Sequence, residues 1–310
     1  MATYNGASFI GKQIQSLVDQ THDNWRLIIR DDGSSDNTVS IIEDCLSRDS
    51  RVTLVSDDFG NLRSSQNFSK LMEAIPAEAS YIMFCDQDDI WIPHKIERSL
   101  HAIKELEHKH GKDQNLMVYG TYTMIDDLGA SIPAGVPNYS VKPDLKLLLS
   151  QNYIYGCTMM INRNLLNLAS PVPLTAENHD YWIALTALVN DGHIAYIKEP
   201  LLFYRQHLQN VSGSFANAFL LNRIRRLFSQ TEAGYLRNRL KMFISLSERF
   251  GSTIRPEVRA LLNGQIRALT RGGWNAFLYN IRHGIGRIGM SQTALYYLNV
   301  LRLKKLKERV

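Results

Sequence analysis

The sequence predicts an α/β fold, in which a mostly parallel sheet is flanked by helices and followed by a helical C-terminal extension. Three observations predict this fold. Short apolar segments alternate with amphipathic ones through the first half, acidic clusters follow two of the apolar segments, and the pattern after Gly213 is helical and basic. Alternating strands and helices typically form parallel strands joined by crossover helices. With 310 residues, 45% of them hydrophobic, the chain is long enough for a substantial core.

The individual elements follow from the spacing of apolar residues. Short runs rich in Ile, Val and Leu predict strands, and apolar residues three and four apart predict helices. Helix 36–48 has Ser35 or Asp36 as its N-cap. The predicted strands are residues 25–30, 51–55, 81–85, 116–125 and 158–162, with two shorter ones at 193–197 and 201–204. The predicted helices are residues 36–48, 67–75, 93–108 and 180–189, and residues 131–143 form a loop.

Charge is distributed unevenly along the chain. Residues 1–214 hold 17 Lys/Arg and 26 Asp/Glu, a net of −9, whereas residues 215–310 hold 18 and 4, a net of +14. We therefore expect an acidic domain at 1–213, which could hold a cation and is unsuited to nucleic acid, and a basic helical region at 214–310. A basic region favours a polyanionic partner, most simply an anionic membrane surface.

Location is predicted from three features of the sequence. No run of 18 apolar residues could span a bilayer, and no basic-then-apolar leader is present. The three cysteines are widely separated, which fits a reducing compartment. We expect a cytoplasmic protein that lies against the inner face of the cell membrane.

Aspartates follow two of the predicted strands. Asp31 and Asp32 come after the first, where a turn and a helix cap are sufficient explanations. Asp86, Asp88 and Asp89 come after the other, and three carboxylates in four residues repel one another unless a cation such as Mg²⁺ or Mn²⁺ binds them. No G-x-G-x-x-G follows a strand and no P-loop motif occurs, which disfavours dinucleotide oxidoreductases and P-loop NTPases.

Three segments in register carry a family resemblance: residues 2–6 (ATYNG), 31–38 (DDGSSDNT) and 86–91 (DQDDIW). Together with residues 177–182 (ENHDYW) and 204–212 (YRQHLQNVS), they resemble family 2 glycosyltransferases of the GT-A fold. The resemblance covers residues 1–213. The later two segments look most like bacterial rhamnosyltransferases of surface polysaccharide synthesis.

The resemblance implies a donor site for a nucleoside-diphosphate sugar. Its nucleotide-binding residues are Thr3, Tyr4, Asn5, Asp86 and either Asp32 or Asp31, the last pair as partner of the base. Tyr4 could equally be a core aromatic.

The resemblance also implies a divalent metal, Mn²⁺ or Mg²⁺, held by Asp88 and His207. Asp86 would approach the ribose or this metal. A histidine with no motif around it is more often structural, and the Tyr-Arg-x-His context is what favours His207 as a ligand.

On the acceptor side the resemblance implies that Asp180 is the general base, because inverting transfer needs a carboxylate that takes the acceptor's proton. Asp180 could also cap the following helix, and Glu177 is the next candidate for the base. Gly156 falls in an acceptor-side loop. Trp182 is either a sugar platform or core, and Arg205 either contacts phosphate or pairs with a carboxylate of the domain.

The expected function is therefore inverting, metal-dependent transfer of a sugar, such as rhamnose, to a glycan or lipid-linked acceptor. Two alternatives remain: a non-catalytic sugar-nucleotide or glycan-binding module, and a sugar nucleotidyltransferase. The second usually carries a Gly-rich basic phosphate loop, which this sequence lacks.

Two structural expectations complete the prediction. The family has a full apolar strand before the ATYNG segment, so the shortened strand here should leave its neighbours partly unpaired. Residues 235–250 and 294–310 have amphipathic spacing with basic residues, which favours helices lying on a membrane. The same helices could instead pack on the acidic domain.

Overall fold

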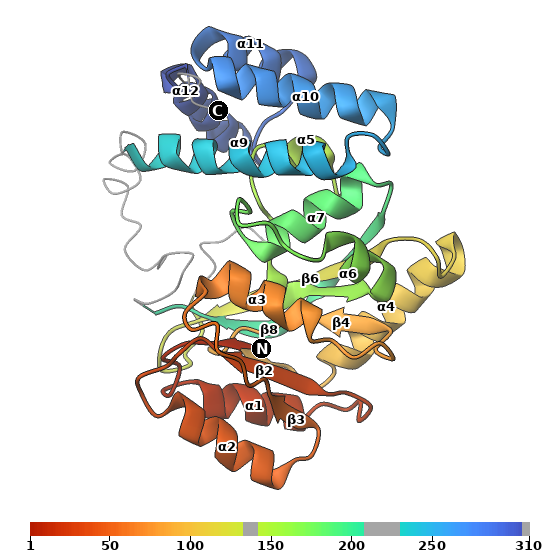
Figure 1. Cartoon of the computed structure of the whole chain (residues 1–310), viewed down its shortest axis with the longest axis vertical. Helices are drawn as coiled ribbons and strands as arrows, with labels where there is room; N and C mark the ends of the chain where they lie inside the picture. Colours follow the sequence, from red (N-terminus) through yellow and green to blue (C-terminus); the bar gives the residue numbers. More distant parts are fainter. Residues whose placement is uncertain (133–141, 208–229, 306–310) are drawn as a thin grey trace.

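The computed structural model describes residues 1–132, 142–207 and 230–305. A small parallel sheet begins the chain, with strand order β1-β2-β3. Its strands are β1 (Ala2–Thr3), β2 (Leu27–Asp31) and β3 (Val52–Leu54), and helices α1 (Ile10–Val18) and α2 (Thr38–Arg48) lie at the same end of the molecule (Figure 1). An isolated parallel bridge from Ala2 to Asp86 connects this sheet to the next strand of the chain.

The second sheet has the order β4-β7-β6-β8-β5, and only its β6–β8 pair is parallel. The β4–β7, β6–β7 and β5–β8 pairs are antiparallel, and the connection from β6 to β7 contains the four-residue helix α5 (Leu145–Leu148) and a 3-10 turn. The α/β class is confirmed, with the parallel pairs confined to β1–β3 and β6–β8. The strands are β4 (Tyr81–Met83), β5 (Ile90–Trp91), β6 (Leu116–Ile125), β7 (Met159–Asn162) and β8 (His193–Arg205).

The predicted strands and helices form close to their expected bounds. One difference, in β8, has a physical cause. The two short strands expected at 193–197 and 201–204 are parts of β8, whose register with β6 shifts at Gly120 and Thr121, where Pro200 lies opposite. Proline has no N–H to donate to a strand partner, so the pairing is interrupted there. Helix α1 was not predicted from the sequence.

Helices cover the sheets, and the last helices of the chain lie away from β1–β3. In Figure 1 the last four helices gather at the end of the molecule opposite α2. The remaining helices are α3 (Arg63–Glu73), α4 (Lys95–His110), α6 (Arg163–Ala169), α7 (His179–Val189), α9 (Gln230–Phe250), α10 (Pro256–Arg271), α11 (Gly273–His283) and α12 (Met290–Arg302).

Helix α9 packs on the part of the chain that contains the sheets. It does so through the apolar face that was expected to contact a membrane. Leu236, Leu240 and Phe243 are buried in the same core as α7. The buried Arg239 pairs with Glu177 at 3.1 Å. The expectation that residues 235–250 lie on a membrane is thereby corrected, because that face is covered by protein. The expected domain boundary at 213/214 lies outside the described residues.

A cavity lies beside the two-residue strand β1. β1 has two residues, and the Met1 ammonium donates to the Ile28 carbonyl at 2.6 Å. A cavity of about 550 Å³ lies alongside, lined by Met1, Ile28, Ile82 and Phe84 among other residues in and near β2 and β4.

Among the helices that the structure describes, we find none with the length and hydropathy to cross a membrane.

Candidate functional site

A cavity of about 620 Å³ lies where β1, β2 and β4 end and α7 begins. The structure brings most of the predicted site residues together around it. Asp31, Trp182 and Arg205 are not among the residues that line it. The predicted residues that do line it are Thr3, Tyr4, Asn5, Asp32, Asp86, Asp88, Gly156, Asp180 and His207.

The segment after β1 is fixed by both aspartate-rich turns. The Tyr4 main chain donates to Gln87 Oε1 at 2.8 Å and accepts from Gln87 Nε2 at 3.0 Å. Asn5 has a positive φ of 47°, and its side-chain oxygen accepts from the Ser35 N–H at 2.8 Å. The Tyr4 ring is half exposed on the cavity wall, which leaves a flat aromatic face for a planar ligand.

Hydrogen bonds from the protein occupy the aspartates of the turn at residues 31–36. Asp31 accepts from the Thr3 hydroxyl at 2.8 Å and from the Ser34 N–H at 2.7 Å. Asp32 is buried and accepts from the Arg30 guanidinium and from the Arg63 N–H, both at 2.7 Å. This turn is therefore a rigid wall of the cavity.

The aspartates of the turn at residues 86–89 face one another instead. Asp88 Oδ2 lies 2.8 Å from His207 Nε2, so the two predicted metal ligands are adjacent. Burial, followed by the charges of Asp88 and Asp180, raises the pKa of Asp86 to about 7. Asp89 is buried with a raised pKa, and its Oδ2 receives no hydrogen bond from any described residue.

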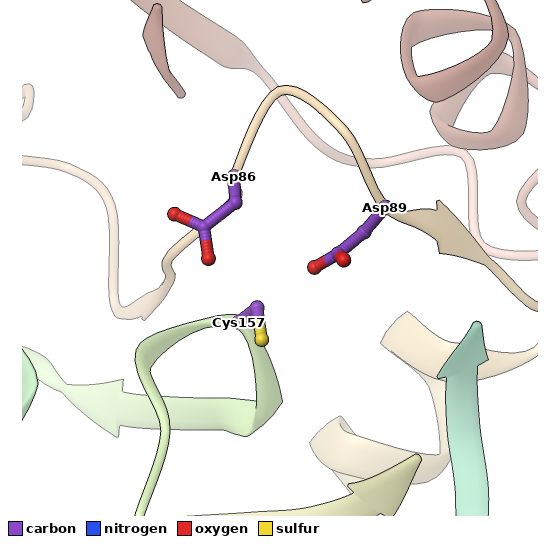
Figure 2. A group of neighbouring side chains, drawn as sticks. All are labelled: Asp86, Asp89 and Cys157. Atoms are coloured by element: carbon purple, nitrogen blue, oxygen red, sulfur yellow. The ribbon is translucent and has the colours of Figure 1, made fainter. Parts of the chain in front are cut away.

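Cys157 lies beside Asp86 and Asp89 and comes from a different loop, as Figure 2 shows. One ligand atom each of Asp86, Asp89 and Cys157 lies within 4.8 Å of the others. Burial raises the pKa of the Cys157 thiol, which keeps it protonated and a poor ligand. Lys95 is the nearby buried cation; it donates to the Cys157 carbonyl and lies 3.7 Å from the centre of the Trp91 ring.

These residues fit a divalent cation. The carboxylates are crowded and partly unsatisfied, and carboxylate oxygens are the donors that Mg²⁺ and Mn²⁺ prefer. Asp86 and Asp88 supply such oxygens and His207 a nitrogen in the wall of the cavity, and Asp89 lies next to Asp86.

Asp180 is held at the first turn of α7. Its Oδ1 accepts from Asn152 Nδ2 and its Oδ2 from the Gly156 N–H, both at 3.0 Å. Burial raises the pKa of Asp180 to about 6, and these hydrogen bonds oppose the rise. The carboxylate is thus ionised near neutral pH and fixed in orientation, which suits a general base.

The small size of Gly156 allows the loop at residues 155–157 to lie close to His179 and Asp180. A Cβ at position 156 would lie 2.6 Å from His179 Nε2, so only glycine fits without displacing that ring. The His179 ring is buried and stacks on Phe68 at 3.9 Å between centroids. Burial lowers its pKa to about 3, so the ring is neutral and serves to pack the wall of the site.

Two of the predicted site residues do not face the cavity. Trp182 is fully buried, its Nε1–H donates to the Ala169 carbonyl at 2.8 Å, and it packs in the core rather than forming a sugar platform. Arg205 is also buried, and its guanidinium donates to the main-chain carbonyls of Asp88, Asp126 and Asp127. Arg205 therefore shapes the turn that bears Asp88 and does not reach into the cavity.

A model of the family described as "Glycosyl transferase family 2" matches residues 1–166. The chain belongs to glycosyl transferase family 2.

Curated relatives agree with this assignment. The chain is 29% identical over 226 residues to an uncharacterised glycosyltransferase of Rickettsia felis, matching 69% of this chain and 35% of the relative. The chain thus spans about a third of the length of that relative. It is 27% identical over 230 residues to the dTDP-rhamnosyl transferase RfbG of Shigella flexneri, covering 69% of this chain and 74% of RfbG. It is also 29% identical over 218 residues to the glucosyltransferase WfgD of Escherichia coli, covering 69% and 78%.

Solved structures of glycosyltransferases share the fold of this family 2 chain. S. aureus TarS 1–349 in complex with UDP aligns with a TM-score of 0.53 at 17% identity, over 92% of this chain and 90% of TarS. GalNAc-T7 with UDP, GalNAc and Mn²⁺ aligns with a TM-score of 0.54 at 12% identity, over 88% and 54%. The GT-A fold expected from the motifs is confirmed.

Two cavity residues of this family 2 chain were missed by sequence reasoning. Asn152 and Tyr155 line the cavity, and Asn152 is a direct partner of Asp180. Neither lies in an acidic or Gly-rich motif that singles it out. Tyr155 and Cys157 flank Gly156, so the small loop that contains all three was the available signal.

Proposed function

We propose that this chain is an inverting, metal-dependent glycosyltransferase that moves a sugar from a nucleoside-diphosphate donor to a hydroxyl of a glycan or lipid-linked acceptor. The observation that carries the proposal is that Asp180, Asp86, Asp88 and His207 line one cavity. A base and a cation site in the same cavity are what transfer from a diphosphate requires. A module that only binds would not need Asp180 fixed and ionised.

The donor lies against the ends of β1, β2 and β4. The Tyr4 ring stacks on the base, and Thr3, Asn5 and Asp32 fix the nucleoside, with Asp86 on the ribose side. Asp88 and His207 hold a Mn²⁺ or Mg²⁺ ion. When bound, that ion neutralises the diphosphate and makes it a better leaving group.

The acceptor approaches from the side of Gly156. Asp180 accepts the proton of the acceptor hydroxyl while its oxygen forms a bond to the anomeric carbon of the donor sugar. The bond from that carbon to the diphosphate breaks, and the electron pair leaves with the nucleoside diphosphate. Attack from the face opposite the leaving group inverts the anomeric configuration.

The substrates are assigned by analogy with RfbG and WfgD, whose names specify dTDP-rhamnose chemistry and a UDP-Glc donor with a diphosphoundecaprenol acceptor. We place the activity in cell-surface polysaccharide synthesis, with rhamnose as the first donor sugar to test. The enzyme works at the cytoplasmic face of the membrane, with residues 1–213 as the catalytic domain and 214–310 as a basic region contacting lipid.

A donor panel tests the function. The purified chain is incubated with UDP-, dTDP- and GDP-sugars and Mn²⁺, and release of nucleoside diphosphate is measured with and without a lipid-linked glycan acceptor. We expect acceptor-dependent release from one donor, and its loss in Asp180→Asn. Nucleotide binding without release from any donor would favour a binding module. Release of inorganic pyrophosphate in a parallel assay that supplies a nucleoside triphosphate and a sugar 1-phosphate would indicate a nucleotidyltransferase.

A further inference from the structure

Helices α11 and α12 carry large apolar side chains on their outer surface. Trp274, Leu278 and Ile281 of α11 are 67%, 59% and 48% exposed, and Met290 and Leu298 of α12 are 92% and 49% exposed. The spacing is i, i+4, i+7 on α11 and i, i+8 on α12, so each set lies on one face of its helix. We call these five residues the α11–α12 face.

The two halves of this face are continuous. The Trp274 ring lies 5.4 Å from Phe277, and Phe277 lies 5.8 Å from Tyr297 of α12, as measured between ring centroids. The Gly273 N–H at the start of α11 donates to the Leu303 carbonyl just after α12, at 2.9 Å. The start of one helix therefore touches the end of the other, and aromatic contacts link Trp274 to Tyr297 of α12.

The inner faces of these helices already have a core. Gln265 of α10 donates to Asn280 of α11 at 3.1 Å, and the Tyr296 hydroxyl of α12 donates to the same Asn280 oxygen at 2.9 Å. All three residues are buried. The exposed apolar side chains are thus additional to the packing that holds α10, α11 and α12 together.

Positive charge surrounds the face. Arg271 precedes α11 and Arg282 lies in its last turn, while Arg302, Lys304 and Lys305 follow the end of α12, and all five are exposed. The sequence contains no Asp or Glu from residue 258 to residue 307. These two helices and the residues just after them therefore carry positive charge and no negatively charged side chain of their own.

We propose that the α11–α12 face binds the surface of an anionic lipid bilayer, with α11 and α12 lying in the plane of the headgroups. Exposed Trp, Leu and Ile beside Arg and Lys are the features of a helix pair that lies in the interface between water and acyl chains. Each basic residue held near an anionic leaflet raises partitioning about fivefold. A second copy of this chain fits less well as the partner of this face, because the basic residues of the two copies would repel each other.

This inference deepens the proposed function by naming the surface that presents the enzyme to a lipid-linked acceptor, and it rests on that function only for the acceptor. It moves the membrane contact away from α9, whose apolar face is buried.

Vesicle flotation without donor or acceptor tests the proposal. The full chain should float with vesicles containing phosphatidylglycerol and remain at the bottom with neutral phosphatidylcholine vesicles. The triple variant Trp274→Ser, Leu278→Ser, Ile281→Ser should lose at least tenfold in partitioning, because its side chains are exposed and their removal leaves the core intact. The variant Arg302→Gln, Lys304→Gln, Lys305→Gln should lose at least as much.

The matched control removes three exposed lysines that lie in or just after α4, not in α11 or α12. This variant, Lys104→Gln, Lys109→Gln, Lys112→Gln, should float as the wild type does. Equal flotation of the serine variant and the wild type would overturn the proposal. So would a dimer in solution that the serine variant dissociates. Nucleoside-diphosphate release measured without vesicles reports on the proposed function separately, and both triple variants should retain it.

Discussion

The turn at residues 31–36 and the turn at residues 86–89 each follow a strand and each contain three aspartates. In the first, main-chain N–H groups, hydroxyls and Arg30 donate to the carboxylates. In the second, the carboxylates crowd one another, the pKa of Asp86 and Asp89 is raised, and Asp89 Oδ2 lacks a donor among the described residues. An acidic turn that satisfies its own carboxylates builds a wall, and one that does not is suited to hold a cation.

Asp180 combines features of both turns, and it gives the largest expected effect. It accepts hydrogen bonds from the Gly156 N–H and Asn152, as the first turn's aspartates do, yet burial raises its pKa as in the second. Asp180→Asn should reduce transfer at least ~10²-fold, because the amide cannot accept the acceptor's proton. Donor affinity, measured by calorimetric titration, should stay within about twofold. Near-normal turnover would move the base to Glu177.

Asp32 tests the satisfied turn. Asp32→Asn should lower the free energy of unfolding by about 2 kcal/mol, a factor of ~30 in the unfolding equilibrium, because buried Arg30 loses one of its two carboxylate partners. Urea denaturation measures the change. A variant as stable as the wild type would show that this turn does not depend on its carboxylates.

Asp88 tests the crowded turn in the opposite sense. Asp88→Ala should weaken Mn²⁺-dependent binding of the nucleoside diphosphate at least ~10-fold, since a metal ligand is removed. The free energy of unfolding should remain unchanged or rise slightly, because one of the mutually repelling carboxylates is gone. Titration of the nucleotide with and without Mn²⁺ decides the point, with the wild type as the comparison. A metal effect equal to that of the wild type would remove Asp88 from the site.

The pH dependence gives the smallest effect. Because Asp180 must be ionised to act as a base and its pKa is about 6, kcat/KM should fall below pH 6 by about tenfold per pH unit. The folded chain holds this proton more tightly than the unfolded chain, whose aspartates have a pKa of 3.8. The metal-free protein should therefore lose stability as the pH rises from about 4 to about 6. In Asp180→Asn this loss of stability should become smaller, because only Asp86 and Asp89 then contribute to it. A slope equal to that of the wild type would exclude Asp180 as a source.

Much of the site could be predicted because its residues belong to short motifs at strand ends. Thr3, Tyr4 and Asn5 follow β1, Asp32 follows β2, and the 86–89 turn follows β4. Strands that run side by side place such segments at one edge, so local spacing was enough to bring them together. The pairing of Asp88 with His207 came from the family motif rather than from local spacing.

The sequence by itself determined the α/β class, the family, the cavity's acidic residues and the helical, basic character of the C-terminal region. The tertiary structure decided where each charge and ring goes. Trp182 and Arg205 belong to motifs yet are buried. Trp182 packs in the core and donates to the Ala169 carbonyl, and Arg205 donates to the Asp88 carbonyl. Arg239 of α9 turns inward to Glu177, whereas the basic residues beside α11 and α12 stay exposed, although both belong to one basic region. Periodicity shows that a helix has two faces, but which of them is covered depends on partners far away in the sequence.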